Sequence, residues 1–303
     1  MRRIWQFLIH RYPWLDAQHP LAQRDLARIP VIPHFFRRLT EVRSILGYAA
    51  LIHLIMFIVA MIIYTYLPPA FSGWLAPFLT PFGMPVAAAM LHSILYWGLL
   101  IGVCNNTTAL VSRDVKARSL ELLRLTPYNV WEIVLTKLTA LRSSWRGILL
   151  ALLITRLVAG LSVPLSNSLE AHKGSPFDYL QTAMFIVQPI FDMLLVTSLS
   201  ILSSVITADP TWARLSAYGM IGLTLGALGT FNSIWLVFTS PLGAMAGMFG
   251  PLSHWSMLAV ALTPRQDPDW YVPQLVVMAT VHLILPLLIG ILALRQSVKL
   301  ISR

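Results

Sequence analysis

Long apolar segments separated by short polar ones follow each other through most of this chain. A helix needs about 20 apolar residues to cross a bilayer. Segments close to this length lie at residues 45–67, 85–111, 147–164, 179–207, 215–238 and 272–294. The pattern therefore predicts an all-α, polytopic integral membrane protein with six transmembrane helices, the transmembrane domain being residues 45–303.

One further apolar segment, residues 239–264, is interrupted by two prolines and three glycines. If it crossed the membrane completely, the basic residues that follow the last span would lie on the outer side, against the usual charge bias. We therefore expect a re-entrant or outer-leaflet pair of short, broken helices before the last span. Such irregular backbone is tolerated where it is buried in protein or lines a wet cavity.

Residues 1–44 combine arginines with aromatic side chains, and Pro30 and Pro33 divide the region into two helical parts. This mixture suits the lipid headgroup layer, where rings sink in and guanidinium groups meet phosphate. We expect an N-terminal amphipathic, interfacial or cytosolic region that contacts membrane lipid. A basic flank that only sets the orientation of the first span is the alternative.

Composition supports the membrane class: 57% of residues are hydrophobic, 11% are charged, and the mean hydropathy is +0.71. The net charge of +10 does not point to nucleic acid, because the basic residues cluster beside apolar spans. Of the 22 lysines and arginines, only Lys173 and Arg265 fall on the outer side, and Arg156 falls within a span. This bias predicts a multi-pass protein of the inner (plasma) membrane with both termini cytosolic.

A charged island, residues 112–146, connects the second and third spans on the cytosolic side. Ser112 is placed to cap a helix through Leu125, with Asp114 in its first turn. Within that helix, Asp114 and Arg118 would be four residues apart, and Glu121 would face Arg118 and Arg124. The island predicts a soluble surface for a cytosolic partner, or else a loop without a partner.

The second half of the island predicts a separate amphipathic helix. Thr126 and Pro127 suit the N-cap and first turn of such a helix. A membrane-facing apolar stripe would follow, formed by Val130, Ile133, Val134, Leu138 and Leu141. The third span would begin only after it, at Gly147.

The run RDVKARSLELLRLTPYNVWEIVLTKL, residues 113–138, resembles the cytosolic signature of the permease subunits of type-2 ATP-binding-cassette (ABC) transporters. HPLAQRDLAR, residues 19–28, is similar to the N-terminal helix of many members, which begins Asn-Pro and contains Arg/Lys-Glu-Leu. This chain departs from the pattern at His19, where Asn is usual, and at Thr136, where Gly commonly precedes the lysine. With the span order, the resemblance covers nearly the whole chain.

The resemblance implies a membrane-spanning permease subunit of an ABC transporter, most consistent with an exporter, which pairs with a second permease subunit as a homo- or heterodimer. A coupling helix between spans two and three would dock on a cytosolic ABC ATPase subunit. The coupling contacts it implies are Arg113, Asp114, Arg118, Glu121 and Arg124. The alternative is a structural or accessory subunit of a larger membrane complex that retains the permease fold.

No catalytic constellation is evident, and the chain is not expected to be an enzyme. The sequence lacks the G-x-x-x-x-G-K-[ST] loop that cradles nucleotide phosphates, so ATP and Mg²⁺ would be bound by the partner ATPase. Cys104 is the only cysteine, and His53, His92 and His282 have no carboxylate neighbours at ligand spacing. We predict no metal site and no cofactor in this chain.

Two charges fall near the middle of consecutive, antiparallel spans: Arg156 in the third and Asp192 in the fourth. Because an isolated arginine at the bilayer centre costs about 2.5 kcal/mol or more, we expect the two to meet. They could form a structural clamp or belong to a transport pathway. Alternatively, Arg156 could extend past Pro164 to the membrane surface.

The fifth span carries glycines at spacings of 3, 4 and 3 residues: Gly219, Gly222, Gly226 and Gly229. Such small-residue faces allow membrane helices to approach closely, so we expect helix packing there. A groove that contacts substrate is the alternative interpretation.

Overall fold

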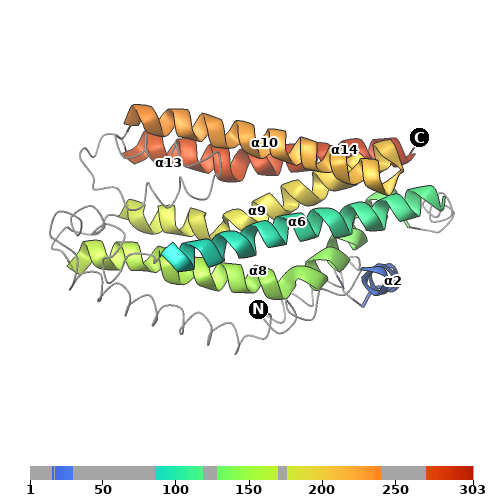
Figure 1. The fold of residues 1–303 in the computed structure, drawn as a ribbon, viewed down its shortest axis with the longest axis horizontal. Coiled ribbons are helices and arrows are strands. Elements are labelled where there is room, and N and C mark those ends of the chain that lie inside the picture. The colour runs from blue at the N-terminus through green and yellow to red at the C-terminus, as the bar shows by residue number, and fades with distance from the viewer. Residues whose placement is uncertain are drawn as a thin grey trace.

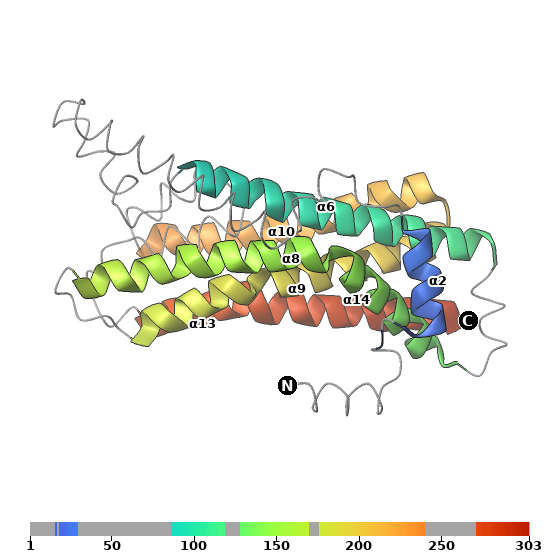
Figure 2. The same ribbon diagram turned by 90° about the horizontal axis from the view of Figure 1, so that it is seen from below.

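The computed structural model describes residue 16 and residues 18–29, 86–118, 128–169, 176–239 and 271–302. Within these residues the regular elements are all helices. The long helices run alongside one another in a single bundle, and a short helix lies across one end of it (Figures 1 and 2). We call this the α2 end, after that helix.

The helices follow the predicted order. They are α2 (Pro20–Arg28), α6 (Val86–Lys116), α8 (Val130–Leu169), α9 (Pro176–Thr207), α10 (Pro210–Thr239), α13 (Tyr271–Ala279), the π-helical turn η3 (Thr280–Ile284) and α14 (Leu285–Ser302). The long helices coincide with the second to sixth predicted spans. The first span and nearly all of segment 239–264 lie outside the described residues.

Two described helical stretches are long and apolar enough to cross a membrane. They are Ala183–Thr207 and Leu275–Ser302, whose most apolar 18-residue windows have mean hydropathies of 1.9 and 2.6. These helices agree with the membrane class predicted from composition. The count of six spans stays a prediction.

Helix α9 is the centre of the bundle and contacts α6, α8, α10 and α14. Its buried face is rich in small hydroxyl side chains. Thr197, Ser198, Ser200 and Ser204 each donate to the backbone carbonyl four residues earlier, at 2.7 Å. The hydroxyls are thus satisfied within the helix, and their small size lets neighbouring helices approach.

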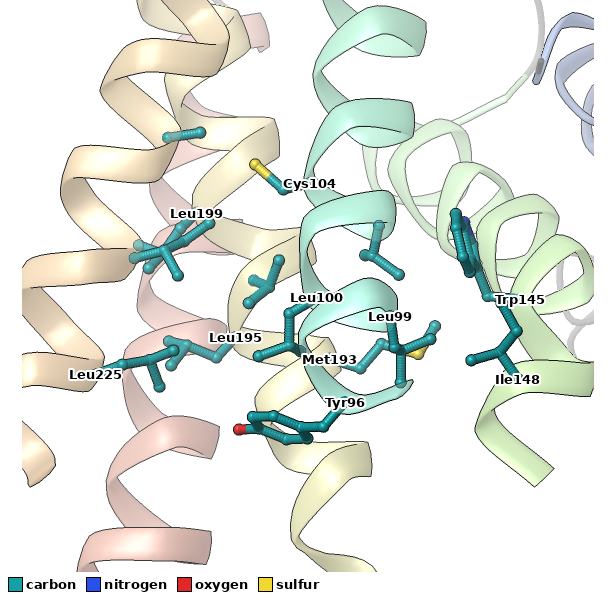
Figure 3. Packing of buried hydrophobic residues seen from close by; sticks show 14 of the residues in the cluster. Tyr96, Leu99, Leu100, Cys104, Trp145, Ile148, Met193, Leu195, Leu199 and Leu225 are labelled. Atoms are coloured by element: carbon teal, nitrogen blue, oxygen red, sulfur yellow. The ribbon is translucent and has the colours of Figure 1, made fainter. Parts of the chain in front are cut away.

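The main hydrophobic core lies around α9 and joins all five long helices. Figure 3 shows side chains of α6, α8, α9 and α10 meeting there. The core includes Tyr96, Leu99, Leu100 and Cys104 of α6, Trp145 and Ile148 of α8, Met193, Leu195 and Leu199 of α9, Leu225 of α10 and Ala293 of α14. This core holds the polar residues described below in fixed positions.

The predicted helix from Ser112 to Leu125 does not begin at Ser112. That residue is buried inside α6, which continues without a break to Lys116. Arg118 then has φ of 52°, so the helix has already ended. The helix of the second span continues through Ser112, because a serine that can cap a helix can also lie inside one.

Helix α8 is also longer than predicted, because the second island helix and the third span form one continuous helix of 40 residues. It begins after Asn129 rather than after Thr126. The Trp131 amide donates to Asn129 Oδ1 at 3.2 Å, and the Asn129 amide donates to Glu132 Oε2 at 2.9 Å. These two bonds form a capping box.

The expected membrane-facing stripe of this helix lies inside the protein. Ile133, Val134 and Leu141 are at most 2% exposed. Val134 packs in a cluster with Val111 and Ile201, and Leu141 packs in another that includes Ile29. These three side chains are thus covered by other helices, and the polar neighbours Thr136 and Lys137 are buried as well.

We predict that Gly102→Ala destabilises the protein and Gly98→Ala does not. A Cβ atom at Gly102 would collide with the ring of the buried Trp145, whereas one at Gly98 meets nothing within 4 Å. Overpacking of this kind costs about 1–3 kcal/mol, while alanine in an open helical position is neutral or slightly favourable. Thermal unfolding of the two purified variants in one detergent measures the difference. Equal midpoints would contradict the close α6–α8 contact.

Candidate functional site

The most highly charged part of the described structure is a buried ion cluster at the α2 end. It joins Arg24, Asp25 and Arg28 of α2 to Asp114 near the end of α6 and Lys137 of α8. Both carboxylates and the lysine are at most 2% exposed. Two negative and three positive groups therefore meet where α2 crosses the ends of α6 and α8.

Lys137 lies between the two carboxylates. Its Nζ donates to Asp25 Oδ2 at 3.1 Å and also to Asp114 Oδ2. A buried carboxylate is costly unless a cation and hydrogen bonds compensate it. One lysine thus stabilises a carboxylate from α2 and one from α6, and it joins both to α8.

The arginines of α2 complete the cluster from its more exposed side. Arg28 Nη1 donates to Asp114 Oδ1 at 2.9 Å, and Arg24 Nη2 donates to Asp114 Oδ2 at 3.1 Å. Arg24 also donates to the neighbouring Asp25, at 2.8 Å from Nη2. Asp114 therefore accepts hydrogen bonds from two helices other than its own.

The two departures from the family pattern have local structural roles. His19 caps α2, since its Nδ1 accepts a hydrogen bond from the Leu21 amide at 3.3 Å, which is the role a capping asparagine would have. Thr136 is buried and donates to the carbonyl of Glu132 at 2.8 Å. Each replacement is accommodated within its own helix.

The predicted coupling residues occupy different environments. Arg113 and Arg118 are exposed, whereas Asp114 is 0% exposed and bonded within the ion cluster. The expected helical pairing of Asp114 with Arg118 rested on a helix that ends at Lys116. Glu121 and Arg124 lie outside the described residues. Of the five, Asp114 is thus an internal contact and not part of the surface.

A second polar cluster lies inside the bundle and contains both predicted intramembrane charges. Arg156 and Asp192 are at most 1% exposed and close enough for their charges to interact. Tyr96 of α6 contacts both: its hydroxyl donates to Asp192 Oδ2 at 2.6 Å, and its ring centroid lies 5.3 Å from Arg156 Cζ. The structure therefore brings the two charges to one site, and Arg156 does not extend to the surface.

Three members of this interior cluster were not predicted as site residues. They are Tyr96, Gln188 and His282. Gln188 Oε1 accepts from Arg156 Nη1 at 3.0 Å, and Gln188 Nε2 approaches His282 Nδ1 at 3.5 Å. His282 is 1% exposed. A glutamine within an apolar span was the sequence signal, since such a residue needs a polar partner.

The glycines of α10 do not mark a helix contact within the described structure. A Cβ atom at Gly219, Gly222 or Gly226 would meet nothing within 4 Å; Gly229 is buried. Gly222 and Gly226 instead line an apolar groove of about 320 Å³ between α6 and α10, together with Trp97, Leu100, Ile101, Cys104, Tyr218, Ile221 and Leu225. The close packing expected at the first three glycines is not seen within the chain.

The described residues contain no group of three or more histidine, cysteine, aspartate or glutamate side chains able to hold a metal ion. No family of known proteins, no curated protein and no solved structure matches the chain. The functional argument therefore depends on the two polar clusters and on the sequence.

We predict that Lys137→Met destabilises the protein by about 3–5 kcal/mol, because two buried carboxylates lose their shared cation. Lys116→Met is the matched control. Lys116 is exposed at the end of α6, close to Asp114 in sequence, so its loss should change the stability by less than about 0.5 kcal/mol. Chemical or thermal unfolding in detergent measures both. Similar stabilities for the two variants would show that the cluster contributes little.

Proposed function

We propose that this protein is the membrane-spanning permease subunit of an ABC transporter, consistent with an exporter. A separate cytosolic ATPase would bind and hydrolyse ATP, and a second permease subunit would complete the transporter. The protein would reside in the plasma membrane with both termini cytosolic. Membrane lipid would contact the N-terminal region.

The main support for this proposal is a contact between two distant parts of the sequence. Residues from both runs that resemble the family lie together in the structure. Arg24 and Asp25 come from the run that is similar to the N-terminal helix, and Asp114 and Lys137 come from the signature run. All four belong to the buried ion cluster.

The position of this cluster gives it a mechanical role in the proposal. The residues between α6 and α8 include the proposed docking segment, and both helices extend from it through the bundle (Figure 2). The ion cluster joins those helices to each other and to α2 immediately beside the segment. A force that an ATPase applies to the segment would therefore move α2, α6 and α8 together.

The surface available for that contact differs from the one predicted initially. Arg113 and Arg118 are exposed, whereas Asp114 is not. We propose Arg113, Arg118, Glu121 and Arg124 as the partner contacts. Asp114 would position the end of α6 from within.

The experiment is purification of the tagged protein in mild detergent with its partners identified by mass spectrometry. We expect a stoichiometric ATPase that contains a phosphate-binding loop. Recovery of other membrane subunits without such an ATPase would overturn the proposal and favour an accessory subunit of a larger membrane complex.

We further predict that Glu121→Lys reduces ATPase recovery at least about tenfold, since a reversed charge at a contact replaces attraction with repulsion. Arg295→Glu is the control. Arg295 is an exposed residue of α14, the helix whose C-terminal end lies at the α2 end of the bundle (Figure 1), and it is not a proposed contact. If both variants retained the ATPase equally, the assignment of Glu121 as a contact would be wrong.

A further inference from the structure

Helix α9 contains Pro189 in its interior. Proline has no amide hydrogen, so the carbonyl four residues earlier loses its helical donor. That carbonyl belongs to Phe185. Arg156 of α8 supplies the missing donor, because its Nη1 lies 2.6 Å from the Phe185 carbonyl oxygen. A guanidinium from a neighbouring helix thus replaces a backbone amide.

Arg156 also contacts Gln188 and Phe185 before the break, in addition to its interactions with Tyr96 and Asp192. Its Nη1 also donates to Gln188 Oε1 at 3.0 Å, and its Cζ lies 4.5 Å from the ring centroid of Phe185. Asp192, on the other side of Pro189, is held by Tyr96 of α6 at 2.6 Å. Arg156 thus bonds directly to the part of α9 before Pro189, whereas the part after it is bonded to α6 through Asp192.

A second helix is interrupted close to the first. At η3, the Leu285 amide donates to the Thr280 carbonyl, five residues earlier, as in a π-helix. Pro286 follows directly and has no amide for the His282 carbonyl, which explains why the regular helical register is lost there. His282 itself faces Gln188 of α9, so the two interruptions lie side by side.

The segments that precede these interruptions pack as a unit. Met184 and Phe185 of α9 form a small apolar cluster with Met278 of α13, and Leu283 of η3 packs against it. The main core contains none of these side chains and includes α9 residues that follow Pro189, such as Leu195 and Leu199. The small cluster formed by these segments is thus separate from the main core.

We propose that residues 176–188 of α9 and helix α13 form the movable block of this bundle, which bends at Pro189 and η3. Arg156 holds this block in place through its bond to the Phe185 carbonyl. Helices bend at prolines and π-turns because fewer backbone hydrogen bonds oppose the motion. Opening the block separates Arg156 from the Phe185 carbonyl, to which Pro189 cannot donate in its place. This inference concerns the chain itself and does not depend on an ATPase partner.

The test measures distances between spin labels in the full-length protein in lipid nanodiscs, after Cys104→Ala. One label pair replaces Leu180 and Leu223, which are 50% and 77% exposed and lie on the proposed movable block and on α10. The control pair replaces Leu150 of α8 and Leu223, both outside the movable block. Arg156→Met should increase the population of a second distance about tenfold or more in the first pair, and leave the control pair unchanged.

Pro189→Ala makes the test specific, because an alanine at this position returns a backbone donor to the Phe185 carbonyl. In the Pro189→Ala background, Arg156→Met should change the population of the second distance in the first label pair by less than about threefold. Pro210→Ala is the control proline, since Pro210 is the first residue of α10, where an amide would have no acceptor within that helix. It should not alter the effect of Arg156→Met.

Three results would overturn the proposal. Arg156→Met could leave the distance distribution of the first label pair unchanged, or could change the distributions of both pairs alike. It could also have the same effect in the Pro189→Ala background as in the protein that retains Pro189. If the Arg156→Met variant does not fold, the distance distribution of the first label pair in the Pro189→Ala variant tests the hinge by itself. Pro189→Ala should narrow the distance distribution of the first pair, and an unchanged or wider distribution would contradict the hinge.

Discussion

A carboxylate can be buried only where a cation compensates it, and at the α2 end of this bundle two carboxylates share Lys137. This requirement fixes several parts of the chain at once. Moving α2 away from α8 would break the buried Asp25–Lys137 pair, so α2 stays against α8. Asp114 imposes the same condition on α6. Three helices from distant parts of the sequence therefore behave as one unit beside the segment that separates α6 from α8.

The interior of the bundle obeys a related rule for the backbone. Every carbonyl removed from water needs a donor, and Pro189 deprives the Phe185 carbonyl of its own. Arg156 satisfies that carbonyl and at the same time obtains an acceptor for its buried charge. A proline and an arginine that would each be costly alone compensate one another. The ion cluster makes one end of the bundle rigid, whereas the proline and the π-turn leave the other part fewer backbone bonds.

The sequence predicted the helical class and the positions of the long helices well, because apolar length and charge bias are direct consequences of a membrane environment. It also placed Arg156 and Asp192 near each other, and in the structure Tyr96 contacts both. It did not reveal that Lys137 is buried, since its partner Asp25 is far away in the chain. It suggested close packing at Gly222, although the tight contact lies at Gly102 against Trp145. Spacing identifies a face of a helix but not what covers that face.

The central claim, that buried charges hold α2 against the bundle, is tested most directly by hydrogen exchange of the backbone amides of α2 at low and high salt. Buried ion pairs are screened far less than exposed ones. The account predicts that α2 of the wild-type protein is equally protected at about 0.1 M and about 1 M salt. Loss of protection at high salt, or exchange as fast as in an unstructured peptide at both concentrations, would contradict it.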